Sequence, residues 1–233
     1  MFSTLLSEIS EQDKQFTVYR HGEQTDLETQ FETHNVTVTH ESLPPGGPEP
    51  FVVIEDDERF SGAIALADLE TLIEPPIIRP GDRDEVSKGY RIVFDVLDET
   101  VFTSMNRRQL LAVSREIEDR AFRVGNGTLR VSFQTLSTFK SQAELYRYLA
   151  TSTELDIHIY GIDDWEPPTI PGITYHELKS ELLGQYWVLA FDGGSSASQA
   201  SALVAQEQRE GYNGFWTDDT RLVDDILAEL AAL

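Results

Sequence analysis

The sequence predicts an α+β fold, in which a mixed sheet is flanked by helices. Short apolar and alternating segments typical of strands are interspersed with helix-period segments along the whole chain. The length of 233 residues suffices for one large domain or two small ones. A chain of this size buries about 70–75% of its unfolded surface, so it needs no covalent staple. The chain contains no cysteine, which excludes a disulfide framework and any Cys-ligated metal.

The first part of the chain begins with a predicted amphipathic helix over residues 1–11, with Leu5, Leu6 and Ile9 on one side. Residues 36–39 alternate with period two, as a half-buried strand does. An acidic turn at residues 55–58 joins the two strands of a predicted hairpin. The other elements predicted here are a strand at 16–19, helices at 25–33 and 66–73, a loop at 43–50, and hairpin strands at 51–54 and 60–65.

A stretch rich in proline and charge, residues 74–84, predicts a linker. It contains three prolines and a glycine, and domain boundaries fall in segments of this composition. We therefore divide the chain into an N-terminal α/β lobe of residues 1–76, a linker of residues 77–87 and a second domain of residues 88–233.

The helix predicted at Asn106–Arg123 has the clearest signals in the second part. Asn106 can serve as its N-cap. Four apolar residues share one face at helical spacing, and the glycines at 125 and 127 end the helix. The remaining elements predicted are helices at 89–97, 142–149, 198–209 and 220–230, strands at 101–103, 129–133, 155–160, 173–176, 186–191 and 214–217, and a loop at 163–172.

The two parts share an order of elements that suggests an internal duplication. Each has a helix followed by a strand, then a strand that ends in His-Glu, at His40-Glu41 and at His176-Glu177. Each then continues with an apolar strand, a turn and a helix, at residues 51–73 and 186–207. We therefore hypothesise two related α/β lobes, with chance similarity as the alternative.

The acidity of the chain allows two interpretations. Asp and Glu number 41 against 18 Lys and Arg, for a formal net charge of −23. Such a protein either binds a basic partner or works in concentrated salt, where a Debye length of about 3 Å at 1 M screens its self-repulsion. The acids are dispersed and lysine is scarce, which favours a halophilic, archaeal source. Nucleic-acid binding is not expected, because no net-positive face remains.

The sequence has no signature of an enzyme or a metal site. No nucleophile elbow, Walker loop, zinc-protease motif or kinase catalytic loop occurs. The histidines are scattered singly, without a spacing that marks metal ligands. We therefore expect no enzymatic activity and no metal, and the sequence names no cofactor. No signal peptide or membrane span is expected either, which predicts a cytoplasmic protein.

One turn offers an alternative. Residues 191–196 link a predicted strand to the helix predicted at 198–209, and Gly193, Gly194 and Ser195 lie in this turn. Free amides at a helix N-terminus attract anions. The alternative function is therefore a nucleotide- or phosphate-ester-binding enzyme that uses Gly193–Ser196, against a plain turn capped by serine.

The helix at Asn106–Arg123 concentrates arginine in an otherwise acidic chain. It is either a solvated face held by i,i+4 ion pairs (Glu116–Arg120, Asp119–Arg123) or a docking face for an acidic partner or anionic ligand. Trp216 belongs to a late cluster of aromatic residues that packing explains in large part. The binding candidates from the helix and this cluster are Arg107, Arg108, Arg115, Glu118, Asp119, Arg120 and Trp216.

Three stretches resemble a known family. They are FDVLDETVFTSMNRRQLLAVSREIEDRAFRVGNGTLRVSFQTLSTF from Phe94, YWVLAFDGGSSASQASALVAQEQ from Tyr186, and YNGFWTDDTRLVDDIL from Tyr212. The chain resembles the DICT domain, a sensory domain of diguanylate cyclases and two-component systems, over roughly residues 86–233. The stand-alone form in halophilic archaea also carries an N-terminal part like residues 1–76.

The resemblance implies an α+β sensory or regulatory protein of signal transduction, linked to light or environmental responses. It implies a signalling partner, such as a kinase or another regulator, and leaves the ligand and a homo-oligomer open. No kinase, cyclase or DNA-binding segment accompanies the domain in this chain. We therefore expect an adaptor that acts by protein–protein contact.

Overall fold

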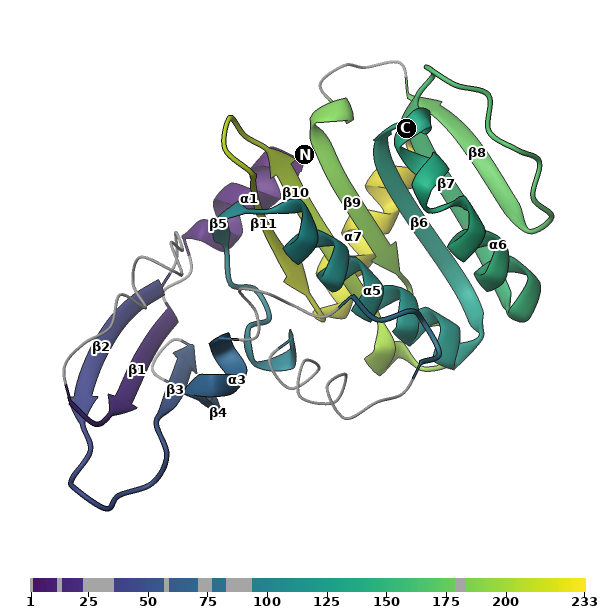
Figure 1. Ribbon diagram of the computed structural model, residues 1–233. Helices are drawn as coiled ribbons and strands as arrows, with labels where there is room; N and C mark the ends of the chain where they lie inside the picture. The colour runs from purple at the N-terminus through teal and green to yellow at the C-terminus, as the bar shows by residue number, and fades with distance from the viewer. Residues whose placement is uncertain are drawn as a thin grey trace.

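The computed structural model describes residues 2–11, 14–22, 36–56, 59–70, 77–82, 94–178 and 183–233. Within these residues the chain forms two sheets (Figure 1). The larger has seven strands in the order β5-β11-β10-β9-β6-β7-β8. Its strands are β5 (Phe102–Met105), β6 (Asn126–Thr135), β7 (Glu154–Ile162), β8 (Ile173–Leu178), β9 (Tyr186–Phe191), β10 (Ser201–Glu207) and β11 (Tyr212–Thr217). β6, β7 and β8 run parallel and the other pairs are antiparallel, which confirms the mixed sheet and the α+β class.

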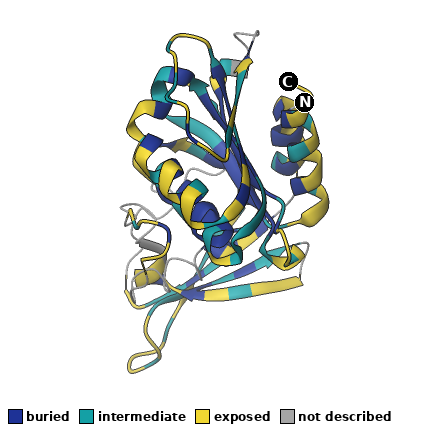
Figure 2. Ribbon diagram, turned by 90° about the vertical axis from the view of Figure 1, so that its right-hand side faces the viewer, coloured by how far each residue is buried: buried dark blue, intermediate teal, exposed yellow. Residues whose placement is uncertain are grey.

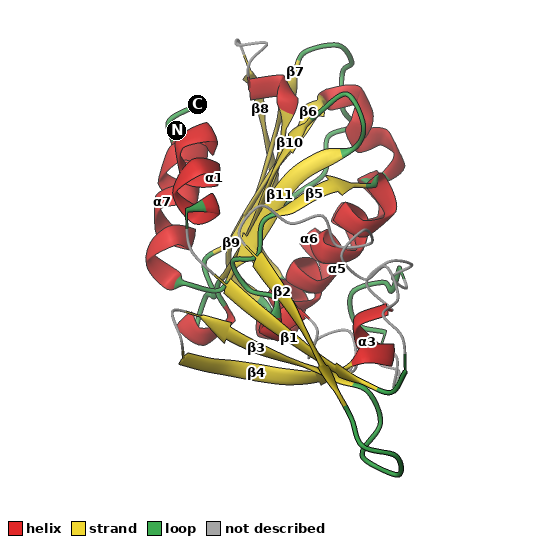
Figure 3. Ribbon diagram, turned by 90° about the vertical axis from the view of Figure 1, so that its left-hand side faces the viewer, coloured by secondary structure: helices red, strands yellow, loops and turns green. Residues whose placement is uncertain are grey.

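Helices cover both faces of the larger sheet (Figure 3). The helices α5 (Arg107–Val124) and α6 (Ala143–Ser152) lie on one face. The helices α1 (Phe2–Ser10) and α7 (Thr220–Ala231) lie side by side on the other. Figure 2 shows that each helix turns its buried side to the sheet and its exposed side to solvent. Short 3₁₀ turns at Leu136–Ser141, Leu183–Gln185 and Ala197–Gln199 complete the connections.

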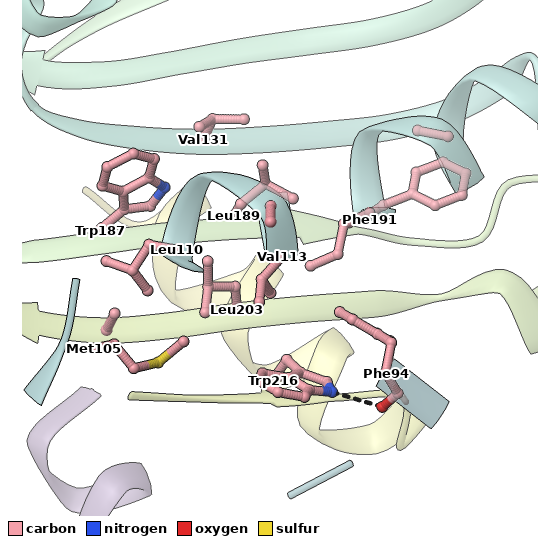
Figure 4. Close-up of a cluster of buried hydrophobic side chains, with 14 of the residues drawn as sticks. Phe94, Met105, Leu110, Val113, Val131, Trp187, Leu189, Phe191, Leu203 and Trp216 are labelled. Carbon is pink, nitrogen blue, oxygen red and sulfur yellow. Dashed lines mark hydrogen bonds between the residues drawn. The ribbon is translucent and has the colours of Figure 1, made fainter. Parts of the chain in front are cut away.

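The core between α5 and the sheet contains large apolar side chains from α5 and from strands β5, β6, β9, β10 and β11 (Figure 4). Trp216 of β11 is fully buried and stacks between Phe94 and Phe102, at ring distances of 5.0 and 5.2 Å. Its indole nitrogen donates a 2.8 Å hydrogen bond to the carbonyl of Phe94. Trp216 is therefore a core residue, and the structure does not support its candidacy as a binding residue.

The smaller sheet has the strand order β2-β1-β3-β4. Its strands are β1 (Lys14–Arg20), β2 (Val36–Ser42), β3 (Phe51–Asp56) and β4 (Arg59–Ala65), followed by the short helix α3 (Leu66–Glu70). Phe16, Val18, Val52 and Ile54 are buried and belong to the same apolar cluster as the α5 side of the larger sheet. This core runs from one sheet into the other. It does not test the boundaries predicted at residues 76 and 87, which stay a prediction.

Most predicted elements agree with the structure within one to three residues. The helix predicted at 25–33 and most of the helix predicted at 89–97 lie outside the described residues, and the structure describes the linker only at residues 77–82. The helix predicted at 198–209 is wrong, because the chain forms strand β10 there. Residues 201–205 are buried in succession, with Leu203 against the α5 side of the sheet and Val204 against the α1 and α7 side. Burial on both faces of a central strand thus overrides the helical propensity of this alanine-rich segment.

The hypothesis of two related lobes finds a partial counterpart. Each predicted pair forms two parallel neighbouring strands, β1 with β2 and β7 with β8. Tyr160 is paired with His176 in the larger sheet, and Val18 with His40 in the smaller. The next strands differ, because β3 pairs with β1 whereas β9 pairs with β6. The helix expected after the apolar strand in each part is also missing from the larger sheet, because residues 201–207 form strand β10 there. The likeness is therefore confined to a helix followed by one parallel strand pair, α1 before β1 and β2, and α6 before β7 and β8.

Across the part of the chain that the structure describes, no helix has the length and apolar character needed to cross a membrane.

Candidate functional site

Helix α5 begins and ends where its capping residues predict. Asn106 accepts a 3.0 Å hydrogen bond from the backbone N–H of Gln109, and the Gln109 side chain accepts a 2.8 Å bond from the backbone N–H of Asn106. This capping box satisfies two amide donors at the start of the helix. Gly125 ends the helix in the left-handed conformation, with φ 75°. The caps fix α5 over the sheet and so position its charged side chains.

The middle of α5 carries a buried ion-pair network around Arg120. Its guanidinium bonds Asp95 at 2.6 Å and Asp218 at 2.8 Å, and lies 3.4 Å from Glu116. It also lies 4.9 Å from the ring of Phe94. Burial lowers the pKa of Arg120, but the surrounding carboxylates outweigh this and hold the pKa above its usual value. Arg120 thus ties α5 to the start of α7 and to the segment before β5.

A second network joins α5 to α6. Glu118 is 1% exposed and accepts hydrogen bonds from Arg115 and, at 2.6 Å, from the hydroxyl of Tyr146. Arg115 also donates to the side chain of Gln142 at the start of α6. Burial, followed by the Glu118 charge, raises the pKa of Tyr146 well above its usual value. Its hydroxyl therefore stays protonated and donates to Glu118 at any ordinary pH.

Asp119 completes the buried charges of this helix. It accepts a 2.8 Å bond from the backbone N–H of Gly81 and a 2.8 Å bond from Arg123. Both i,i+4 pairs expected from the sequence therefore exist. The expected solvated face is wrong, because Glu116, Glu118, Asp119 and Arg120 are 1–6% exposed. Their burial also rules out Glu118, Asp119 and Arg120 as contacts of an external docking partner, and Arg115 is largely covered.

The N-terminal end of α5 is different. Arg107 and Arg108 are exposed, and the first turn contains no acidic residue. The positive end of a helix dipole disfavours cations by about 0.3–1 kcal/mol each, so this placement does not help the helix to form. The guanidinium of Arg107 lies 5.8 Å from the centre of the Trp187 ring. Of the arginines predicted to bind a partner, the structure leaves these two on the surface.

Trp187 borders a narrow crevice between α5, the start of α6 and strands β6 and β9. Apolar side chains such as Leu111, Val131 and Leu189 form most of its wall. Trp187 is 4% exposed, and its indole nitrogen has no hydrogen-bond partner among the described residues. Figure 4 shows this nitrogen turned toward the space beside Val131 and Leu189. A buried donor left unpaired costs about 1–3 kcal/mol, so this group calls for an explanation.

Three amides of the turn at residues 192–196, those of Gly194, Ser195 and Ser196, are bonded within the protein. The N–H of Gly194 donates to the Asp192 carboxylate at 2.8 Å, and the N–H of Ser195 donates to the Asn126 side chain at 2.9 Å. Gly194 has φ 51°, and a Cβ at this position would lie 2.2 Å from the carbonyl of Asn126, so glycine is required for packing. The predicted helix after the turn is absent, since only a three-residue 3₁₀ turn follows. The anion site proposed at Gly193, Gly194 and Ser195 therefore lacks its structural basis.

A charged cluster lies where the two sheets meet. Lys14 of β1 is 4% exposed, donates to the backbone carbonyl of Asp98 and lies 3.9 Å from the Asp56 carboxylate. Burial lowers the pKa of Lys14. The carboxylate of Asp98 accepts a 2.9 Å bond from the backbone N–H of Asp218. Burial and the Asp218 charge raise the pKa of Asp98 to about 7, which places a titrating group near neutral pH at the sheet junction.

Two histidines that the sequence presented as isolated are hydrogen-bonded. His158 of β7 and His176 of β8 approach at 2.9 Å between Nδ1 and Nε2. His158 Nε2 lies 3.0 Å from the Asp156 carboxylate. Since a carboxylate only accepts, His158 donates from Nε2 and accepts at Nδ1 from His176. Burial, followed by His158 and Arg130, lowers the pKa of His176. The alternating positions of His158 and Tyr160 on a predicted strand were the available signal, but the register with β8 was not visible.

Among the described residues, no group of three or more His, Asp and Glu side chains is arranged to hold a metal ion. The structure therefore adds no metal candidate to the sequence analysis.

Comparison with known proteins gives one informative match. A family model described as DICT, "Sensory domain in DIguanylate Cyclases and Two-component system", matches residues 92–208. This range contains α5, α6 and strands β5 to β10, and ends before β11 and α7. No curated protein matches the chain.

Among solved structures, a crystal structure of polyphosphate kinase from Porphyromonas gingivalis is similar with a TM-score of 0.37 and 11% identity. The similarity covers 97% of this chain and 47% of that protein, so the chain spans about half of its length. A similarity at this level supports no conclusion about activity.

Proposed function

Because the chain belongs to the DICT family of sensory domains, we propose that it is a regulatory adaptor of signal transduction that works through protein–protein contact. The proposed output surface is the N-terminal end of α5, with Arg107 and Arg108. The partner is a signalling protein, such as a kinase or another regulator, that presents carboxylates to these guanidinium groups.

The observation that supports this surface is the contrast between the arginines of α5. Arg120 is buried and Arg115 is largely covered, whereas Arg107 and Arg108 are exposed. Arg107 and Arg108 project from the first turn, where the helix dipole disfavours cations. Guanidinium groups bind carboxylates in a bidentate geometry, so two neighbouring arginines suit an acidic segment of a partner. The chain has a formal net charge of −23, so two exposed arginines form a local positive patch on an acidic protein. Such a patch selects where an acidic partner docks.

The test is affinity capture from the native host with a charge-reversed variant, Arg107→Glu with Arg108→Glu. A matched control reverses two other exposed arginines, Arg147→Glu with Arg221→Glu, and changes the net charge equally. Arg221 occupies the second helical position of α7, as Arg108 does in α5. We expect the first variant to lose at least about tenfold of the captured partner, as the loss of two charged contacts implies. Equal capture by both variants would contradict the proposed surface.

The capture is designed for molar potassium chloride. We propose that the dispersed acidic surface is an adaptation to concentrated salt, inside a cell that maintains it. At such concentrations the Debye length is only a few ångströms, so the repulsion among surface carboxylates is screened. The melting temperature of the wild-type chain is then expected to rise steadily from 0.1 to 2 M potassium chloride. A melting temperature independent of salt would contradict this adaptation.

A further inference from the structure

We infer that the groove between α1 and strands β10 and β11 binds a small, neutral molecule with several hydroxyl groups, such as a sugar or a cyclic polyol. Figure 1 shows α1 beside these strands and β5. The inference rests on three features: the space with its uncharged lining, a wall of acceptors opposite a wall of donors, and a strained connection to the first turn of α5. The third feature rests on the proposed output surface, and the first two do not.

The first feature is the space and its lining. The groove encloses about 530 Å³, within the range of about 300–1,000 Å³ of small-molecule sites, and it is open to solvent on one side. The crevice beside Trp187, by contrast, has no room for a water molecule. The described residues that line the groove are all uncharged, in a chain with a formal net charge of −23. An ionic ligand would find no counter-charge here, so the lining suits a neutral one.

The second feature begins with the wall that α1 forms. Ser3, Ser7 and Ser10 follow one another at i, i+4 and i+7, so they lie on one flank of the helix. The Ser7 hydroxyl donates to the carbonyl of Ser3 at 3.0 Å, and the Ser10 hydroxyl donates to the carbonyl of Leu6 at 2.6 Å. Both protons are thus used within α1, and the oxygen lone pairs remain as acceptors for a ligand.

The sheet supplies donors on the other side. Gln206 of β10 and Asn213 of β11 are direct neighbours in the antiparallel register, and both line the groove. Their side-chain oxygens accept long hydrogen bonds of 3.4 Å, from the side chain of Gln208 and from the backbone N–H of Ser104 respectively. Their amide nitrogens have no partner among the described residues and remain available as donors.

These two walls match the chemistry of a polyol. A hydroxyl group both donates and accepts, so a ligand with hydroxyls around its ring can bond the serine oxygens and the amide nitrogens at once. The remaining lining residues are Leu6 and Val101, which are 8% and 1% exposed. They offer apolar contact to the carbon-bound hydrogens of such a ring.

The third feature connects the groove to the proposed output surface. The pairing of β5 with β11 shifts register between Tyr212 and Gly214, so Asn213 lies at a β-bulge. Ser104, whose N–H bonds Asn213, has a left-handed φ of 55°, which is uncommon for a residue other than glycine. It stands two positions before Asn106, the N-cap of α5. A ligand that moves the Asn213 side chain therefore changes the hydrogen bond of this strained residue, next to the first turn of α5.

The test uses the full-length ¹⁵N-labelled chain in molar potassium chloride with three probes. D-Glucose and myo-inositol are neutral, and D-glucuronate carries a carboxylate in place of one hydroxymethyl group of glucose. The variants Gln206→Glu and Asn213→Asp assign the two side-chain NH₂ signals in a ¹H–¹⁵N spectrum. We expect at least one neutral probe to move both signals saturably, with a Kd of about 1 mM. D-Glucuronate should bind about tenfold more weakly than D-glucose, because its charge lacks a partner in the groove.

A matched pair of variants separates the groove from the rest of the chain. Gln206→Glu removes one donor and should weaken binding of the neutral probe about tenfold, the effect of one neutral hydrogen bond. Gln199→Glu changes the net charge equally at the other end of β10 and should bind as the wild type does. Equal binding by the two variants would remove Gln206 from the site and contradict the inference.

Two further results would overturn it on the wild-type chain, so they hold even if Gln206→Glu does not fold. One is that neither neutral probe moves the Gln206 and Asn213 signals up to about 100 mM. The other is equal binding of D-glucose and D-glucuronate. The output surface is tested separately, because a variant with Arg107→Glu and Arg108→Glu should still bind the neutral probe. Partner capture without binding of a neutral probe would leave the proposed function standing and remove the groove as a site.

Discussion

The first turn of helix α5 and the middle of the helix use arginine in opposite ways. At the N-terminal end Arg107 and Arg108 are exposed, in a turn whose dipole disfavours them. Beyond the first turn, Arg115 and Arg120 are covered and bound to carboxylates from α5, from the link between β11 and α7 and from the segment before β5. The same residue type is therefore buried in the fold at Arg120 and exposed on the surface in the first turn. Burial, and not composition, separates the two roles.

The strongest way to break this comparison is to remove the buried arginine. Arg120→Ala leaves Glu116, Asp95 and Asp218 without their shared cation, and breaking a buried ion pair costs about 3–5 kcal/mol. Asp95 and Asp218 reach solvent in part, so we expect a loss of about 3 kcal/mol in the free energy of unfolding. Denaturant-induced unfolding in molar salt measures it. A loss below about 1 kcal/mol would mean that the network is no more than a surface ion pair.

The second prediction concerns pH and the carboxylates around Asp218. The folded-state pKa of Asp98 is about 7, above its ordinary value of 3.8. A raised pKa stabilises the folded state fully below the unfolded pKa, and this contribution is lost as pH rises through the folded one. The wild-type chain should therefore lose stability between about pH 4 and pH 8 relative to Asp98→Asn. The variant keeps the acceptor for the N–H of Asp218.

The expected difference at pH 8 is about 4 kcal/mol in favour of Asp98→Asn, and it should vanish near pH 4. Unfolding curves at both pH values decide the matter. If the asparagine variant were less stable than the wild type at pH 8, Asp98 would be an ordinary ionised carboxylate held by Lys14.

A smaller effect is expected at the junction of α5 and α6. Tyr146→Phe removes one of the two donors to the buried Glu118 and leaves the aromatic packing intact. The lost bond has a charged acceptor, so the free energy of unfolding should fall by about 1.5 kcal/mol. Phe139→Leu would be a poor control because it changes packing. Tyr148→Phe is a better one, since Tyr148 is exposed and should cost less than about 0.5 kcal/mol. Equal losses in the two variants would contradict the role of Glu118.

The smallest effect on stability is expected at the exposed end. Arg107→Glu with Arg108→Glu replaces two cations at a helix N-terminus by two anions, which the helix dipole favours. In molar salt the free energy of unfolding should stay within about 0.5 kcal/mol of the wild type or rise slightly. A loss above about 1 kcal/mol would show that these arginines are structural, like Arg120.

The sequence predicted the boundaries of α5 well, because Asn106, Gly125 and the apolar spacing are local signals. It did not predict which arginines are buried. That depends on residues distant in sequence, such as Asp218, which lies 98 positions from Arg120. The strand β10 was missed for the same reason, since its two covered faces exist only in the assembled sheet.

The candidate sites also differ in whether they depend on local sequence signals or on contacts between residues distant in the sequence. The pair of His158 and His176 follows from the parallel register of β7 and β8, and no spacing along the chain indicates it. The indole N–H of Trp187 is unpaired because no acceptor among the described residues lies within hydrogen-bond distance, and the sequence alone does not show this. By contrast, the exposed position of Arg107 and Arg108 was within reach, because both precede the apolar stripe of a well-capped helix.

The most direct test of the central claim is hydrogen–deuterium exchange of the chain alone and in complex with its captured partner. If the exposed end of α5 is the output surface, the partner should slow exchange at residues 102–111. The buried stretch at residues 115–124 should stay unchanged. Protection confined to another surface, such as the exposed edge strands β2 and β4 of the smaller sheet, would contradict the claim that the first turn of α5 binds the partner.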